Sequence, residues 1–208
     1  MLTGLALMMI LVIAIPSQFL FNDSAFQDQL YAMISSGAEG ALLLFLALTV
    51  LSSIGLPRQI SAFACGYSLG LIEGTLIATM AVTLGCWLTV TFSATFLKNF
   101  IKQRYPNQQQ KIVGFLSEKL FYKAIVIRLL PIGSNFLTNL IVGVCDLNHK
   151  KFVSGSCIGF IPQMIIFTLA GTGVKLANNT HLIASVTLFI IAGILSLWLY
   201  KQHRIKYK

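Results

Sequence analysis

Long apolar runs separated by short polar stretches limit the folds open to this sequence more than any other feature. Hydrophobic residues make up 56% of the 208 residues and charged residues only 10%, whereas soluble globular domains are about 25% charged. A soluble fold cannot hide this much apolar surface. At about 20 residues per crossing, the length allows roughly four to seven membrane segments and no separate soluble domain. We therefore predict an all-α integral membrane protein.

The basic residues lie between the apolar runs, where they indicate membrane topology. The net charge is +9, but cations in these positions mark the cytoplasmic side and meet anionic lipid, so we expect no nucleic-acid partner. The four cysteines lack the paired spacing of a metal site. The sequence also shows no nucleophile elbow, phosphate-binding loop or metalloprotease motif. We accordingly expect no enzyme activity, metal or cofactor.

The first half of the chain predicts one full helix, one broken segment and a second full helix. Leu2 to Phe21 is expected to be a retained transmembrane helix, because no basic residue precedes it as in a secretory signal. Residues 22–39 contain acids but no Lys or Arg, which places them outside the cell. The apolar region 40–72 is broken at Gly55 to Arg58, because Pro57 disfavours helix there. This pattern favours a re-entrant hairpin or two short helices, followed by a crossing over 74–97.

The second half begins with a basic loop and repeats the broken pattern. Residues 98–123 hold six basic residues and one acid, Glu118, so the loop is expected in the cytoplasm, with a surface helix over 108–120. The next apolar region, 124–145, is broken around Pro131. Each limb has about ten residues, or ~15 Å as helix, which is half of the ~30 Å hydrocarbon core. Neither limb can span, so this segment enters and leaves on the cytoplasmic side.

Two further crossings complete the predicted topology, over 152–171 with Pro162 inside and over 181–200, before a basic tail. The expected fold is four full transmembrane helices plus two opposed re-entrant hairpins, with both termini cytoplasmic and 12 of the 15 basic residues inside. Opposed broken segments are typical of the inverted repeats of secondary transporters. The chain then divides into residues 1–39, a membrane domain over 40–175, and the last helix and tail over 176–208.

Polar residues near the two breaks are the candidate site. Irregular backbone inside a membrane is tolerated only where protein buries it or a water-filled cavity meets it. Arg58 follows one proline and Arg128 precedes the other, and a planar guanidinium suits bidentate binding of phosphate. Together the two arginines are candidates to hold a lipid phosphate. The alternative is that each arginine extends to the membrane interface and caps helix carbonyls.

Other polar residues and the break-point residues complete the candidate set. Asn139 either lines the transport path or binds backbone groups freed by the break. Glu73 either accepts a proton for coupled transport or is simply solvated where the first hairpin ends. The residues expected to mark the hairpin breaks at matching positions of the two halves are Pro57, Pro131, Gly66 and Gly143.

Residues 40–175 contain a set of motifs that form a recognisable combination. The second half has Arg128-Leu-Leu-Pro131, Asn139-Leu-Ile-Val-Gly143, Phe152, Gly159-Phe-Ile-Pro162 and Gly171. The first half adds Pro57, Ala64-Cys-Gly66-Tyr-Ser-Leu-Gly70, Gly74 and Gly85. The combined pattern resembles the VTT-domain proteins, the DedA superfamily once labelled SNARE-associated.

This resemblance implies two opposed re-entrant hairpins and movement of lipid across the bilayer. Bacterial relatives of the DedA type imply a polyprenyl phosphate cargo with ion coupling, whereas eukaryotic relatives imply phospholipid scrambling. Arg128 matches the first arginine of the family's second-hairpin motif. Where the DedA type has another arginine, three residues after the proline, this chain has Ser134. The departure favours the less characterised VTT branch.

The expected function is therefore a lipid flippase or scramblase, proton- or ion-coupled, in which Arg58 and Arg128 bind the head group. Two alternatives stay open, an ion or small-solute transporter that uses the same cavity, and a membrane scaffold or assembly factor. The expected partners are membrane lipids, either polyprenyl phosphate or phospholipid, and a homo-oligomer is left open. The absence of long soluble loops favours a bacterial plasma membrane.

Overall fold

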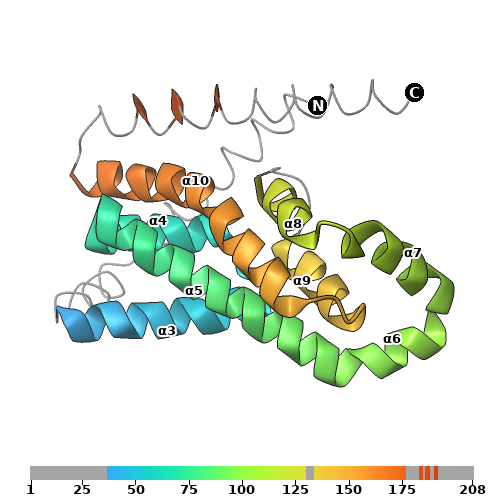
Figure 1. Cartoon of the computed structure of the whole chain (residues 1–208). Helices are drawn as coiled ribbons and strands as arrows, with labels where there is room; N and C mark the ends of the chain where they lie inside the picture. Colours follow the sequence, from blue (N-terminus) through green and yellow to red (C-terminus); the bar gives the residue numbers. More distant parts are fainter. Residues whose placement is uncertain (1–36, 130–133, 177–182, 185, 188–189, 192–208) are drawn as a thin grey trace. The chain divides into compact units, whose positions relative to one another are not determined.

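The structure, a computed structural model, describes residues 37–129 and 134–176 and positions 183, 184, 186, 187, 190 and 191. All regular structure in this part of the chain is helical, as predicted (Figure 1). The elements are α3 (Ala38–Ile54), α4 (Arg58–Leu69), α5 (Leu71–Phe92), the π-helical segment η1 (Ser93–Leu97), α6 (Lys98–Arg104), α7 (Pro106–Ser117), α8 (Leu120–Leu129), α9 (Asn135–Val144) and α10 (His149–Lys175). The predicted first helix, Pro131 and most of the predicted last helix lie outside the described residues.

Two described helices are long and apolar enough to cross a membrane. One is the continuous helix Leu71–Arg104 of 34 residues, which joins α5, η1 and α6, and the other is α10 with 27 residues (Figure 1). At 1.5 Å per residue both exceed the ~30 Å hydrocarbon core. They contain the crossings predicted over 74–97 and 152–171. The first continues beyond the predicted end because 98–104 contains no Gly or Pro, and it stops before Pro106, which opens α7.

The first predicted break is present between α3 and α4. Gly55, with φ of 119°, and Pro57 separate the two helices, which have 17 and 12 residues. A positive φ favours glycine, and proline fixes the backbone that leads into α4. Since these helices are about 25 Å and 18 Å long, each is shorter than the hydrocarbon core.

α8 and α9, each of ten residues, precede and follow the second predicted break. The break itself, residues 130–133 with Pro131, lies outside the described residues. The Oγ of Ser134 accepts a hydrogen bond from the backbone N of Leu137, 3.4 Å away, and so caps the start of α9. Ser134 thus has a local structural role as the N-cap of α9.

The structure differs from the sequence prediction at two glycines expected to mark the breaks. Gly66 lies inside α4 and Gly143 inside α9. A Cβ on Gly66 would lie 2.1 Å from the carbonyl oxygen of Thr168, and one on Gly143 would lie 1.8 Å from the Oγ of Ser93. These glycines allow close helix packing. The chain reverses instead at Gly70, where φ is 85°.

α10 is the packing centre of the unit formed by residues 45–208, because it contacts α4, α5 and α8, while α9 packs on α5 and η1 (Figure 1). Phe152, Phe160 and Met164 of α10 are fully buried. The outer side of α5, in contrast, exposes Ile72, Met80, Trp87 and other large apolar side chains. Such a surface is typical of a helix that faces lipid.

Candidate functional site

The two candidate arginines come together where the helices are interrupted. Arg58 is the first residue of α4 and Arg128 lies one residue before the end of α8. Both are buried, with 6% and 1% of their surface exposed. Their Nη1 atoms donate to the same atom, the Oδ1 of Asn135, over 2.9 Å and 2.8 Å. The Nη2 of Arg58 also donates to the carbonyl oxygen of Arg128, 3.2 Å away. Arg58, at the start of α4, is therefore hydrogen-bonded to both α8 and α9.

Arg128 is fixed by three further polar side chains. Its Nε donates to the Oγ of Ser156 over 3.1 Å, and its Nη2 donates to the Oδ1 of Asn139 over 2.5 Å. The same Nη2 lies 3.7 Å from the Sγ of Cys86, and this thiol donates to the Oδ1 of Asn139 over 3.2 Å. Each nitrogen of the guanidinium thus has a partner. An arginine held this way cannot extend to the interface without breaking all these bonds.

One face of α10 provides the aromatic side of the cluster. The Cζ of Arg128 lies 5.0 Å from the ring centres of both Phe152 and Phe160, and the Cζ of Arg58 lies 5.4 Å from that of Phe160. Cation–π contacts of this kind replace part of the lost hydration. Phe152, Ser156 and Phe160 are spaced four residues apart and so share one face. Gly159 leaves room beside them, because a Cβ there would lie 2.7 Å from the Cβ of Arg128.

The cluster holds two positive charges without a neighbouring carboxylate in the described part of the chain. The four acids there, Glu39, Glu73, Glu118 and Asp146, are all exposed. The only ion pair among the described residues joins Lys98 to Asp146. The two arginine Nη1 atoms lie within about 6 Å of each other because they bond to one oxygen. At an effective dielectric constant of 20, two such charges repel by about 3 kcal/mol.

Two unpartnered polar atoms belong to side chains at the breaks. The Nε of Arg58 and the Oε1 of Gln163 are buried and have no hydrogen-bond partner. The Nε2 of Gln163 donates to the carbonyl oxygen of Leu129, 3.4 Å away, at the last residue of α8. Buried polar groups in native proteins normally have partners. A spare donor and a spare acceptor therefore lie on side chains that contact the end of α8.

The structure brings three of the four polar candidates together and leaves one apart. Asn139 is buried, and its amide oxygen bonds to the arginine and thiol side chains of the cluster. Glu73 is exposed in the first turn of α5, and about 20 Å of helix separate it from Cys86. The role of Glu73 therefore stays a prediction.

Several cluster residues were not found from the sequence: Cys86, Asn135, Ser156 and Phe160. Two spacings contained a signal for them. Asn135 and Asn139 are one helical turn apart, and Phe152, Ser156 and Phe160 follow one another at intervals of four residues in α10. Each pattern also fits ordinary packing, because polar and aromatic residues at helical spacing are common in membrane helices.

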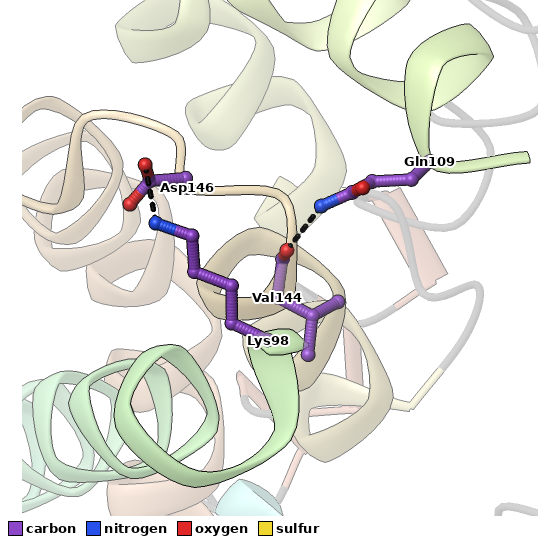
Figure 2. Close-up of polar contacts among 4 residues, drawn as sticks. All are labelled: Lys98, Gln109, Val144 and Asp146. Atoms are coloured by element: carbon purple, nitrogen blue, oxygen red, sulfur yellow. Dashed lines mark hydrogen bonds and ion pairs between the residues drawn. The ribbon is translucent and has the colours of Figure 1, made fainter. Parts of the chain in front are cut away.

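A second group of polar contacts joins the basic segment to the end of α9. The Nζ of Lys98 lies 2.6 Å from the Oδ2 of Asp146, and the Nε2 of Gln109 donates to the carbonyl oxygen of Val144 over 2.6 Å (Figure 2). Asp146 is 63% exposed. The hydrogen bond from Lys98 lowers the pKa of the Asp146 carboxyl below its ordinary value. These contacts place the start of α6 and the start of α7 beside the α9–α10 loop.

Fold and site together define a helical membrane protein in which two interrupted segments meet around a pair of buried cations. The chain belongs to the VTT domain family, whose sequence model matches residues 56–173, more than half of the 208 residues. This match confirms the family expected from the sequence and includes every residue of the arginine cluster. The searches of curated proteins and of solved structures found no match. The family is membrane-associated, and its members are commonly proposed to be transporters or flippases.

Proposed function

We propose that this protein moves a phosphate-bearing lipid across the bilayer, as a flippase or scramblase, and that Arg58 and Arg128 bind the phosphate. One observation carries the proposal. Two buried guanidiniums donate to a single neutral oxygen, and no carboxylate of the described residues contacts them. An uncompensated pair of buried cations is costly, and within a membrane such residues are functional candidates by default.

A phosphate group matches the needs of this cluster. It provides negative charge, which offsets the repulsion between the arginines, and several acceptor oxygens for the guanidinium forks. The unpartnered Nε of Arg58 adds one donor for such a group. Acyl chains would remain outside the cluster, against the apolar surface of the helices.

The interrupted helices supply the path in this proposal. Broken segments that enter from opposite faces and meet near the midplane are the design of many secondary transporters. Asn139 then lines the path beside Arg128, and Glu73 carries a proton if transport is coupled. Both a polyprenyl phosphate and a phospholipid fit this chemistry. We further propose that the protein lies in a bacterial plasma membrane with both termini in the cytoplasm.

Reconstitution in liposomes tests the proposal. Head-group-labelled lipids, including a polyprenyl phosphate, are incorporated, and the rate at which inner-leaflet label becomes accessible is measured with and without an ion gradient. We expect the wild type to accelerate exchange for at least one phosphate-bearing lipid and Arg128→Ala to reduce the rate at least tenfold. Arg104→Ala, which removes an exposed arginine from α6, is the matched control and should exchange at the wild-type rate. Exchange no faster than in protein-free liposomes would refute lipid transport.

A soluble anion is the second candidate cargo, because the cluster recognises charge and none of its contacts requires an acyl chain. Uptake of labelled inorganic phosphate into the same liposomes distinguishes this function. Uptake that depends on Arg128, without lipid exchange, would assign the protein as a solute transporter. If neither activity depends on Arg128, the scaffold hypothesis becomes the better one, with the basic segment 98–123 as the surface to test.

A further inference from the structure

The Oδ1 of Asn135, which accepts a hydrogen bond from both guanidiniums, has a role beyond holding the helices together. We infer that Asn135 is the internal competitor of the anion: its amide oxygen occupies the position between Arg58 and Arg128 that a phosphate oxygen takes on binding. This inference rests on the anion site of the proposed function. It makes Asn135 a positioning residue that determines how readily the arginines accept an anion.

The geometry of the contact supports this role. Both Nη1 atoms approach the amide oxygen at nearly equal distances, 2.9 Å and 2.8 Å. A neutral oxygen can accept from two guanidiniums but cannot neutralise them. An anionic oxygen in the same place makes charge-assisted bonds, which are roughly twice as strong as neutral ones. Exchange of the amide for a phosphate is therefore favourable, while the amide keeps the two guanidiniums oriented.

The surrounding contacts show which groups can move during the exchange. Arg128 keeps its bonds to Ser156 and Asn139 when it loses Asn135, so its position is held. Arg58 has fewer bonds, to Asn135 and to the carbonyl oxygen of Arg128, and its Nε is unpartnered. Asn135 itself is only half-buried and begins α9. We therefore expect Arg128 to stay fixed while Arg58 and Asn135 rearrange.

This exchange links anion binding to the contact between the two interrupted segments. Asn135 lies on the second segment and accepts a hydrogen bond from Arg58 on the first. When a phosphate takes over both guanidiniums, it bridges the segments in place of the amide. Asn135 is then released from both arginines.

Two substitutions at Asn135 separate competition from a purely structural role. Asn135→Asp has nearly the same shape and supplies a built-in anion, so it should stabilise the protein without phosphate and weaken phosphate binding. Asn135→Ala removes the competitor, so it should destabilise the protein without phosphate and strengthen phosphate binding. A purely structural residue would lose stability in Asn135→Ala without any gain in phosphate affinity, so the Ala variant separates the two roles, while the Asp variant tests whether this position faces the anion.

The test is thermal unfolding of the purified full chain in detergent, titrated with inorganic phosphate at constant ionic strength. We expect phosphate to raise the Tm of the wild type saturably. The half-saturating concentration should rise at least tenfold in Asn135→Asp and fall several-fold in Asn135→Ala. The control is Asn148→Asp, the same chemical change at the helix cap of α10, which should leave the titration unchanged. Should the Ala variant fail to fold, Asn135→Ser, which also removes the amide oxygen, takes its place with the same expected gain in phosphate affinity.

A second titration with a short-chain phosphatidic acid distinguishes a lipid head group from free phosphate, and either source supports the inference if Asn135→Ala strengthens its binding. The inference would be overturned if neither compound raised the Tm of the wild type. It would also be overturned if the wild type and Asn135→Asp had the same half-saturating concentration. Phosphate binding that follows the expected pattern without any lipid exchange in liposomes would refute the proposed lipid transport alone.

Discussion

At the scale of single residues, Arg128 shows how one side chain can join several helices. Its guanidinium bonds to α9 through Asn135 and Asn139, to α10 through Ser156, and contacts the thiol of Cys86 on α5. A planar fork with five donors can satisfy these directions at once, whereas a lysine ammonium is a point charge with three donors. Charge alone therefore does not define this position.

We predict that Arg128→Lys loses function although it keeps the positive charge. Lipid exchange in liposomes should fall at least tenfold, close to the level of Arg128→Ala, because an ammonium with three donors and no planar fork cannot replace the contacts of the guanidinium with four side chains. The Ala variant should also unfold more easily, because the buried acceptors on Ser156 and Asn139 lose their donor at about 1 to 3 kcal/mol for each unsatisfied group, while the lost repulsion from Arg58 offsets part of this cost. Wild-type exchange by the Lys variant would mean that only charge matters at this position.

Glycines at close helix contacts give a prediction about stability. A Cβ on Gly143 would lie 1.8 Å from the Oγ of Ser93 and 2.3 Å from the carbonyl oxygen of Val90, so the helices must separate. We expect Gly143→Ala to lower the free energy of unfolding by about 1 to 3 kcal/mol. The matched control is Gly114→Ala in α7, where nothing lies within 4 Å and the change should stabilise by about 0.5 to 1 kcal/mol. Denaturant titrations in detergent measure both.

At the scale of elements, the sequence predicted where helices stop better than which residues meet. Proline and glycine act through local backbone sterics, so the break near Pro57 could be placed from its neighbours alone. The partnership of Arg58 with Asn135 joins positions 77 apart in sequence. No local rule encodes such a contact, because it depends on how α4, α8 and α9 pack together.

The contacts between the basic segment and the α9–α10 loop give a prediction of pH dependence. Because Lys98 lowers the pKa of Asp146 in the folded protein, the pair stabilises the fold above the unfolded pKa, near 4, and loses this effect as pH falls through the folded value. The difference in Tm between wild type and Asp146→Asn should be constant above about pH 5 and shrink below about pH 4. Since the pair is exposed, we expect less than about 1 kcal/mol, and less still in high salt. A difference that grows on acidification would contradict this sign.

At the scale of the whole molecule, these contacts constrain the topology of the segment between α6 and α10. Lys98 touches Asp146, and Gln109 touches Val144 (Figure 2). The starts of α6 and α7 therefore lie close to the end of α9. Neither ten-residue limb crosses the ~30 Å core on its own, so we expect the chain to enter and leave on one side. The basic residues of 98–123 favour the cytoplasm as that side.

Cysteine labelling in cells would test this topology. Cysteines introduced at Gly114 in α7 and at Asn148, directly before α10, are both exposed. Native Cys65, Cys86 and Cys145 are buried, so they should contribute little background, which the wild type measures. If both loops are cytoplasmic, a membrane-impermeant maleimide should label neither position in intact cells and both in inside-out vesicles. Labelling of the two positions from opposite sides would require α8–α9 to span the membrane, and would remove the re-entrant hairpin from which the transport path was inferred.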